Sequence, residues 1–393
     1  MKKDEVIQLE HENIMQTYGR FPVVLVSGKG SMVYDIDGKE YVDMTSGIGV
    51  NSLGYSNEKY NNALKEQIGN ILHTSNIFYN PKTVELAEKL MKVSGMSKVF
   101  FSNSGAEANE GAIKLARKYS AEKYGEARYK IITLKSSFHG RTITTLAATG
   151  QDKFHKDFKP LTTGFDYVER NNIEELAEKI DSSVCAVMME AIQGEGGVFP
   201  LDPEYVNAVR ELCNEKDIAL IFDEVQCGIG RTGEVFGYDN FGIKPDIVTV
   251  AKGLGGGVPI GGFMCNEKFA AVLNKGDHGS TFGGNPLVCA AGVEVLNQVI
   301  NDEFLDEVKS KGQYLREKIM EINSPKIKEI RGAGLMIGVE ISCEASEVIN
   351  KAIEKGALFL TAGKNVIRML PPLVITKDEI DTAVEILKEA LEA

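Results

Sequence analysis

Two apolar stretches of this chain each end in a charged residue, and this pattern constrains the fold more than any other feature. Residues 218–222, Ile-Ala-Leu-Ile-Phe, lead directly to Asp223. Residues 247–251, Ile-Val-Thr-Val-Ala, lead directly to Lys252, and the glycine-rich residues 253–257 follow. Continuous apolar runs of this length are typical of strands that are buried on both faces of a parallel sheet. The pattern therefore predicts an α/β fold in which an acid and a lysine lie at strand ends.

The combination of Asp223, Lys252 and the glycines meets the requirements of pyridoxal phosphate (PLP) chemistry. A lysine amine can bond covalently to the aldehyde of that cofactor, and an acid can keep the pyridine nitrogen protonated so that the ring accepts electrons. Glycines let the backbone approach a cofactor closely. Taken singly, a lysine at a strand end is usually a solvated surface residue, and an aspartate there usually belongs to a turn or a helix cap. The pair at this spacing favours the cofactor site.

The segments around both residues resemble the signatures of the class III PLP-dependent aminotransferases. The first reads Asp-Glu-Val-Gln-Cys-Gly-Ile-Gly-Arg-Thr-Gly at residues 223–233, and the second reads Ala-Lys-Gly-Leu-Gly-Gly-Gly-Val-Pro-Ile-Gly-Gly at residues 251–262. The resemblance extends over nearly the whole chain. It implies the type I fold of PLP-dependent transferases, PLP as the cofactor, and Lys252 and Asp223 as catalytic residues.

Two further segments resemble parts of the same cofactor site. Residues 102–106, Ser-Asn-Ser-Gly-Ala, begin a helical pattern after an apolar run, and the free backbone amides of a helix N-terminus bind phosphate. On the sequence alone, an ordinary capped helix is the commoner interpretation. Phe138 offers an aromatic face on which a pyridine ring can stack. The cofactor-binding residues that the resemblance implies are Ser104, Gly105, Ala106, Phe138, Asp223, Glu224, Val225, Gln226, Lys252 and Thr281, of which Thr281 would reach the cofactor of a second subunit.

Charged and polar residues elsewhere are candidates for substrate binding. A guanidinium can hold a carboxylate in a two-pronged contact, although isolated arginines such as Arg141 and Arg368 are more often solvated. The resemblance to ornithine-type members implies a switch, in which Glu195 covers Arg368 until 2-oxoglutarate brings a second carboxylate. The resemblance also implies substrate contacts for Tyr18 and Ser280, in addition to Arg141.

Within the class, the chain is most similar to acetylornithine-type members, which implies transfer of an amino group from N-acetylornithine to 2-oxoglutarate in arginine biosynthesis. Ornithine, succinylornithine and 4-aminobutyrate aminotransferases share this machinery and stay open as alternatives, as does an aminomutase on the same fold. Tyr55 and Asn57 stand where the family commonly has His and Pro, and Ala191 stands where Pro is usual. His139 is assigned a structural or stacking-support role, because Lys252 already supplies the base.

Composition limits the classes of protein to which this chain can belong. The 393 residues include 43% hydrophobic and 25% charged residues, enough for a large core, and the net charge of −12 argues against a nucleic-acid or anionic-membrane binder. The six cysteines lack metal-binding spacing, and the first residues are acidic where a signal peptide would be apolar. We therefore expect a cytoplasmic protein with no metal and no membrane partner.

The order of apolar runs and helical patterns along the chain predicts its domain organisation. Apolar runs alternate with helical patterns over residues 55–285, which predicts a large PLP-binding domain with a mostly parallel sheet and helices on both faces. Residues 1–54 and residues 286–393 predict a smaller α+β domain that is built from both chain ends. The resemblance implies a homodimer in which each active site is completed by the second subunit.

Overall fold

The structure is a computed structural model that describes all of residues 1–393, and a seven-stranded sheet forms its centre. The strands follow the order β4-β12-β11-β10-β7-β5-β6. Their bounds are β4 (Lys98–Ser102), β5 (Lys130–Leu134), β6 (Phe165–Val168), β7 (Val184–Met189), β10 (Ala219–Asp223), β11 (Ile247–Val250) and β12 (Gly261–Cys265). All neighbours are parallel except β12, which runs antiparallel to both β11 and β4. The predicted α/β fold with a mostly parallel sheet is therefore confirmed.

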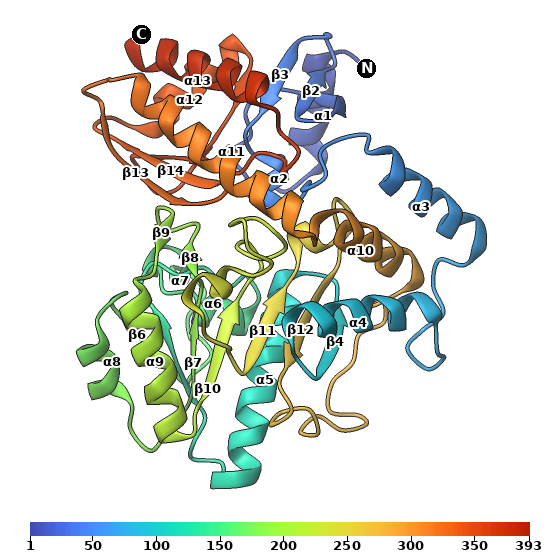
Figure 1. Ribbon diagram of the computed structural model, residues 1–393, viewed down its shortest axis with the longest axis vertical. Helices are drawn as coiled ribbons and strands as arrows, with labels where there is room; N and C mark the ends of the chain where they lie inside the picture. The colour runs from blue at the N-terminus through green and yellow to red at the C-terminus, as the bar shows by residue number, and fades with distance from the viewer.

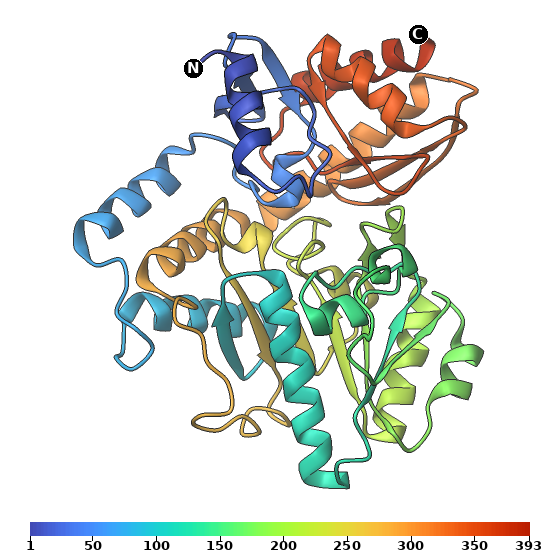
Figure 2. The same cartoon turned by 180° about the vertical axis from the view of Figure 1, so that it is seen from behind.

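Helices cover both faces of this sheet, which explains why its central strands are apolar along most of their length. The helices of this part of the molecule are α3 (Glu58–Asn70), α4 (Pro81–Ser94), α5 (Gly105–Tyr124), α6 (Ile143–Ala148), α7 (Asp152–His155), α8 (Ile173–Lys179), α9 (Pro203–Lys216) and α10 (Pro286–Val299). Figure 2 shows α5 crossing one face of the sheet, whereas Figure 1 shows α8 and α9 on the other. Every residue of β7, β10 and β11 is consequently buried.

Two four-stranded sheets form a second layer, to which both ends of the chain contribute (Figure 1). One has the order β1-β2-β3-β15 and the other has the order β13-β14-β17-β16. Their bounds are β1 (Leu25–Lys29), β2 (Met32–Asp35), β3 (Glu40–Asp43), β13 (Ile327–Ala333), β14 (Met336–Ile341), β15 (Ala357–Leu358), β16 (Leu360–Thr361) and β17 (Val366–Met369). The accompanying helices are α1 (Lys3–Asn13), α2 (Ser46–Gly49), α11 (Asp302–Glu321), α12 (Ala345–Lys355) and α13 (Lys377–Glu392). Because β15 pairs with β3, segments from the two chain ends lie side by side.

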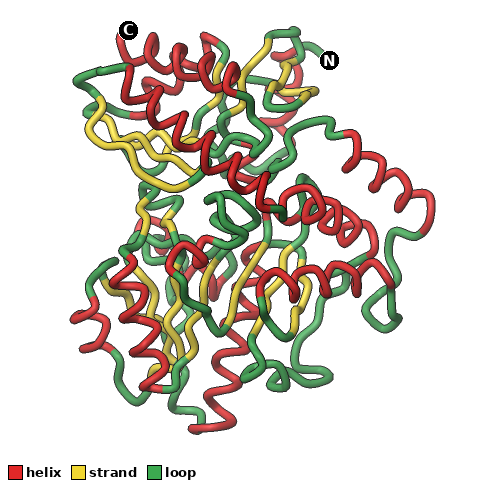
Figure 3. Tube along the Cα trace, in the orientation of Figure 1, coloured by secondary structure: helices red, strands yellow, loops and turns green.

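The remaining elements are short. They are the hairpin of β8 (Ile192–Gln193) and β9 (Phe199–Pro200), and the 3₁₀ helices η1 (Gly237–Phe241) and η2 (Lys252–Leu254). Figure 3 shows that loops occupy much of the region where the two layers meet. No helix combines the length and the apolar character that a membrane span requires.

Some sequence-based expectations differ from the structure in detail. Helix α1 ends at Asn13, because none of its side chains is buried and no packing extends it. Strand β6 was not expected, since it is an edge strand whose first three residues are only partly buried. Helix α10 packs against α3 and α4, although the predicted division assigns it to the C-terminal domain. The boundaries at residues 54 and 285 remain a proposal.

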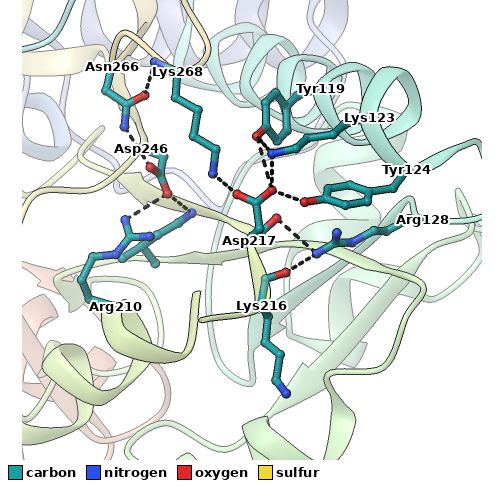
Figure 4. Close-up of polar contacts among 11 residues, drawn as sticks. Tyr119, Lys123, Tyr124, Arg128, Arg210, Lys216, Asp217, Asp246, Asn266 and Lys268 are labelled. Carbon is teal, nitrogen blue, oxygen red and sulfur yellow. Dashed lines mark hydrogen bonds and ion pairs between the residues drawn. The ribbon is translucent and has the colours of Figure 1, made fainter. Parts of the chain in front are cut away.

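A cluster of charges ties the end of α5 to the turn that leads from α9 into β10. Asp217 ends α9 in the left-handed conformation, with φ of 49°. Its carboxylate accepts hydrogen bonds from Lys123 at 2.7 Å, from Lys268 at 2.5 Å and from the hydroxyl of Tyr124 (Figure 4). Burial raises the pKa of Asp217, but these hydrogen bonds outweigh burial and hold the pKa well below its usual range.

We expect Asp217→Asn to lower stability near pH 7 by about 1 kcal/mol, because partly exposed ion pairs are screened by solvent. A depressed folded-state pKa contributes stability above the unfolded pKa of about 4, and this contribution disappears as the pH falls. The difference in urea midpoint between wild type and variant should therefore shrink from pH 6 to pH 3. Asp306→Asn, which removes a more exposed and longer ion pair, serves as the control and should leave the midpoint unchanged.

Candidate active site

A cavity of about 440 Å³ lies beyond the C-terminal ends of the central parallel strands. In α/β folds this edge of the sheet is the usual place for a ligand. Most residues predicted to hold a cofactor or substrate line this cavity, and they come from segments that are far apart in the sequence. The predicted residues that line it are Ser104, Gly105, Ala106, Phe138, Arg141, Asp223, Val225, Gln226 and Lys252.

Lys252 begins η2, and only Ala251 separates it from the end of β11. Its backbone has φ of 40°, a left-handed conformation that is unfavourable for any residue with a Cβ atom. Such strain persists only where the surrounding structure enforces it, and it is concentrated at functional sites. Burial and the nearby charge of Arg368 lower the pKa of the Lys252 amine. A lowered pKa leaves more of the amine unprotonated, which is the form that acts as a nucleophile or base.

Asp223 ends β10, and its buried carboxylate is fixed from three sides. Oδ2 accepts a hydrogen bond from Asn109 Nδ2 at 2.8 Å and lies 2.8 Å from Nδ1 of His139. Oδ1 accepts from the backbone amide of Val225 at 3.0 Å. These partners come from α5, from the loop after β5 and from the loop after β10. The carboxylate therefore presents a fixed negative charge to the cavity.

Helix α5 begins at the cavity, with Ser104 as its cap. Ser104 Oγ accepts from the backbone amide of Glu107. Gly105 and Ala106 occupy the first helical turn, where backbone N–H groups have no partner within the helix, so they suit an anion. A Cβ atom on Gly105 would lie 2.7 Å from Val225 Cγ1, which is too close, so glycine is required there. An anion site, a buried carboxylate and an amine of lowered pKa in one cavity fit the phosphate, the pyridine nitrogen and the aldehyde of PLP.

Arg368 and Glu195 form an ion pair beside this cavity. Arg368 lies on β17 and is buried, and its Nη1 is 2.8 Å from Glu195 Oε1. The same Nη1 donates to Oε1 of Gln226, which lines the cavity, at 3.3 Å. Arg368 Nε is buried without a partner. The structure thus brings together the two residues of the predicted switch, which are 173 positions apart in the sequence.

Arg141 has no acidic partner. Its guanidinium lies over the ring of Phe154, at 3.9 Å from the centroid, and over that of Phe138, at 5.6 Å. These cation–π contacts orient the group while its N–H donors stay available. Arg141 is exposed and lines the cavity, so it can receive a carboxylate.

Six of the predicted site residues do not line this cavity, namely Glu195 and Arg368, which form the ion pair beside it, and four others. Glu224 is buried and accepts hydrogen bonds from the backbone amides of Gly237 and Tyr238, at 2.7 and 3.0 Å, and burial raises its pKa to about 8. The Glu224 side chain therefore stabilises η1 through these two hydrogen bonds. Ser280 and Thr281 line a separate open cavity of about 880 Å³. Tyr18 is exposed in the N-terminal segment.

The sequence did not predict three contacts at this site. Asn109 and His139 both reach Asp223, whereas the sequence predicts only a structural or stacking-support role for His139 and none for Asn109. Glu190 lines the cavity and accepts from the backbone amide of Phe138 at 3.1 Å. Burial, and next the charge of Asp223, raise the pKa of Glu190 well above its usual value. An asparagine inside a long helical pattern was the one available signal for Asn109, because such a residue has low helix propensity.

The sequence of this chain is similar to those of known proteins over nearly its full length. The family model described as "Aminotransferase class-III" matches residues 14–391. The acetylornithine aminotransferase of Caldanaerobacter subterraneus subsp. tengcongensis is 54% identical over 389 residues, which cover 98% of this chain and 99% of the relative.

Solved structures share its fold. An ornithine aminotransferase from Toxoplasma gondii, with partial occupancy of PLP at its active site, has a TM-score of 0.96 at 34% identity, covering 100% of this chain and 94% of that one. The N-acetylornithine aminotransferase of Stenotrophomonas maltophilia K279a has a TM-score of 0.86 at 36% identity and covers 98% of each chain. This chain therefore belongs to the class III aminotransferases, a family of PLP-dependent enzymes.

Proposed function

We propose that this aminotransferase moves the amino group of N-acetylornithine to 2-oxoglutarate, giving N-acetylglutamate 5-semialdehyde and glutamate in arginine biosynthesis. The observation that carries the proposal is the Glu195–Arg368 pair at 2.8 Å beside a cavity that also contains an unpaired Arg141. The site can thus bind one substrate carboxylate through Arg141 alone, or two when Arg368 is also available. The 54% identity to a protein named acetylornithine aminotransferase supports the same donor.

Each residue of the cavity would contact a different part of the cofactor. When bound, PLP supplies an aldehyde that reacts with amines and a ring that accepts electrons. The amides of Gly105 and Ala106 would hold its phosphate, and Phe138 would stack on its ring. Asp223 would keep the pyridine nitrogen protonated, since Asn109 and His139 hold the carboxylate in place.

Lys252 would both tether the aldehyde and move the proton. Its Nζ would accept the proton from the substrate carbon that carries the amino group, and would donate that proton again as the amino group leaves the substrate. Burial and the charge of Arg368 lower the pKa of Nζ and so favour its basic form. One residue therefore serves as nucleophile and as acid–base catalyst.

The two arginines would separate the two substrates by charge. N-acetylornithine carries one carboxylate and a neutral acetamide, whereas 2-oxoglutarate carries two carboxylates. Arg141 would bind the carboxylate remote from the reacting carbon in both half-reactions. Arg368 would bind the carboxylate next to the keto group of 2-oxoglutarate, after Glu195 has moved away from it. With N-acetylornithine bound, Glu195 neutralises Arg368.

Each arginine therefore has its own kinetic signature. Arg368→Ala should slow the 2-oxoglutarate half-reaction by roughly 2–5 kcal/mol of activation free energy and affect the N-acetylornithine half-reaction far less. Arg141→Ala should damage both, and Glu195→Ala should favour glutamate over N-acetylornithine as the first donor. Single-turnover absorbance changes of the cofactor measure each half-reaction. Equal losses in both half-reactions for Arg368→Ala would rule out the switch, but not the aminotransferase.

We also propose that the protein is a homodimer and that it lies in the cytoplasm, which is a reducing compartment. The second cavity, which Ser280 and Thr281 line, also has exposed apolar side chains in its wall, of which Ile77 is 85% and Val84 59% exposed. Exposed apolar patches of this kind are typical of subunit interfaces. All six cysteines are free, and five of them are buried, as suits a reducing compartment. Sedimentation velocity tests the dimer.

The donor is tested with a panel of amines in the presence of 2-oxoglutarate, with glutamate formation as the readout. N-acetylornithine should give the highest kcat/KM, above those of ornithine, succinylornithine and 4-aminobutyrate. A higher value for ornithine would move the assignment to the ornithine type, which includes one of the solved structures with the same fold. Turnover of a donor without 2-oxoglutarate would instead indicate an aminomutase.

A further inference from the structure

Arg368 lies in a row of three residues that crosses the second-layer sheet. Strand pairing places Arg331 of β13 opposite Gly338 of β14, and Gly338 opposite Arg368 of β17. Residues directly opposite on neighbouring strands have side chains on the same face of the sheet. The two arginines therefore extend from one face, roughly 10 Å apart by two strand spacings, with a position lacking a side chain between them.

The loop that carries Glu195 lies over this row. We call residues 194–198, between β8 and β9, the Glu195 loop. At one end of the row, Arg331 Nε donates to the carbonyl oxygen of Gly197 at 2.8 Å. At the other end, Arg368 binds the Glu195 carboxylate at 2.8 Å. Both ends of the row thus contact the same short loop.

The middle of the row is shaped to accept this loop. A Cβ atom on Gly338 would lie 2.7 Å from Cβ and 3.1 Å from Cγ2 of Val198, so only glycine leaves room. Val198 is fully buried and has φ of 55°, a rare conformation for a β-branched residue. A strained backbone of this kind is kept only where its surroundings determine it, which indicates that the loop is held firmly.

A stack of side chains strengthens the same attachment. The ring of Phe199, which follows the loop, lies between two guanidinium groups, with Arg331 at 3.8 Å and Arg170 at 3.7 Å from its centroid. Arg331 is itself fixed by Glu329 at 2.7 Å and Glu340 at 2.6 Å. Arg170 follows β6 of the large sheet, whereas Arg331 belongs to the second layer. The stack therefore fastens the loop to both layers of the molecule.

We propose that Arg331 and Gly338 are positioning residues that fix the backbone of the Glu195 loop, so that Glu195 uncovers Arg368 by turning its side chain while the loop stays in place. The inference rests on the proposed function, in which Glu195 and a substrate carboxylate compete for Arg368. A fixed backbone keeps Glu195 at the distance where it neutralises Arg368 in the absence of a second carboxylate. Loosening the loop should expose Arg368 and shift donor preference toward glutamate.

The test compares the rates of the first half-reaction with glutamate and with N-acetylornithine in the PLP-loaded enzyme. Arg331→Met removes the bond to Gly197 but keeps an apolar chain against Phe199. It should raise the glutamate to N-acetylornithine rate ratio about tenfold, the worth of one charge-assisted hydrogen bond. Gly338→Ala should shift the ratio in the same direction by displacing Val198. Glu344→Gln, which alters an exposed ion pair with Lys364 and none of the contacts of Arg331 or the Glu195 loop, is the control and should leave the ratio unchanged.

A double variant separates this inference from the proposed function. Glu195→Ala alone should raise the ratio, and adding Arg331→Met to it should cause no further rise, because Arg331 acts only through Glu195. If Glu195→Ala leaves the ratio unchanged, the switch is wrong and the inference falls with it. If Glu195→Ala raises the ratio but Arg331→Met does not, the inference alone is wrong. It is also wrong if adding Arg331→Met to Glu195→Ala raises the ratio as much as Arg331→Met does in the wild-type enzyme. Arg331→Met decides the question even if Gly338→Ala fails to fold.

Discussion

Replacing Lys252 with alanine is expected to lower turnover by roughly 10⁴-fold or more, because one amine serves as both nucleophile and base. The visible absorbance band of the bound cofactor should shift or disappear, since alanine cannot bond to the aldehyde. The anion site of Gly105 and Ala106 is unaffected by the change, so the variant should still bind PLP noncovalently. Stopped-flow absorbance with N-acetylornithine, together with steady-state turnover, measures both effects.

A surface lysine provides the control for this variant. Lys244 is exposed and pairs with Asp239 at 3.1 Å, away from the cavity, so Lys244→Ala should retain the wild-type absorbance and turnover. Near-normal turnover of Lys252→Ala would contradict the assignment of this lysine as the catalytic residue, whatever the state of the cofactor.

Asp223→Asn is expected to slow the first half-reaction by roughly 10²–10⁴-fold while the cofactor stays bound, the range that one positioned acid–base or electrostatic group contributes. A neutral amide cannot hold the pyridine nitrogen protonated, so the ring accepts electrons less well. The size and shape of the side chain are preserved, and the cavity should be too. Single-turnover rates combined with the absorbance of bound PLP separate loss of chemistry from loss of cofactor. An unchanged first half-reaction would remove Asp223 from this role.

The fold was predictable where burial dictates the sequence. β7, β10 and β11 have helices on both sides, so all their residues except Asp223 and Thr249 are apolar, and their type and approximate place follow from the sequence. β6 lies at the edge of the sheet, where partial burial permits polar residues and the pattern is weak. The reversed direction of β12 carries no signal in its own five residues, because a buried strand is apolar in either orientation.

The site was predictable where one short segment carries it, and less so where distant segments meet. The segment from Asp223 to Gln226 and the position of Lys252 are predictable from the sequence, because Asp223 ends its strand and only one residue separates Lys252 from the end of the next. The bonds from Asn109 and His139 to Asp223 join residues 114 and 84 positions apart, and only the folded chain brings them together. Glu224 illustrates the reverse case, because alternation along the chain turns its side chain toward η1.

The central claim is tested most directly by mixing the PLP-loaded enzyme with N-acetylornithine alone, without any keto acid. The account predicts one burst of N-acetylglutamate 5-semialdehyde, equal in amount to the Lys252 sites, with a permanent change in cofactor absorbance. Adding 2-oxoglutarate should then restore the original absorbance and release an equal amount of glutamate. Continued product formation without 2-oxoglutarate, or a normal burst with ornithine and none with N-acetylornithine, would contradict it.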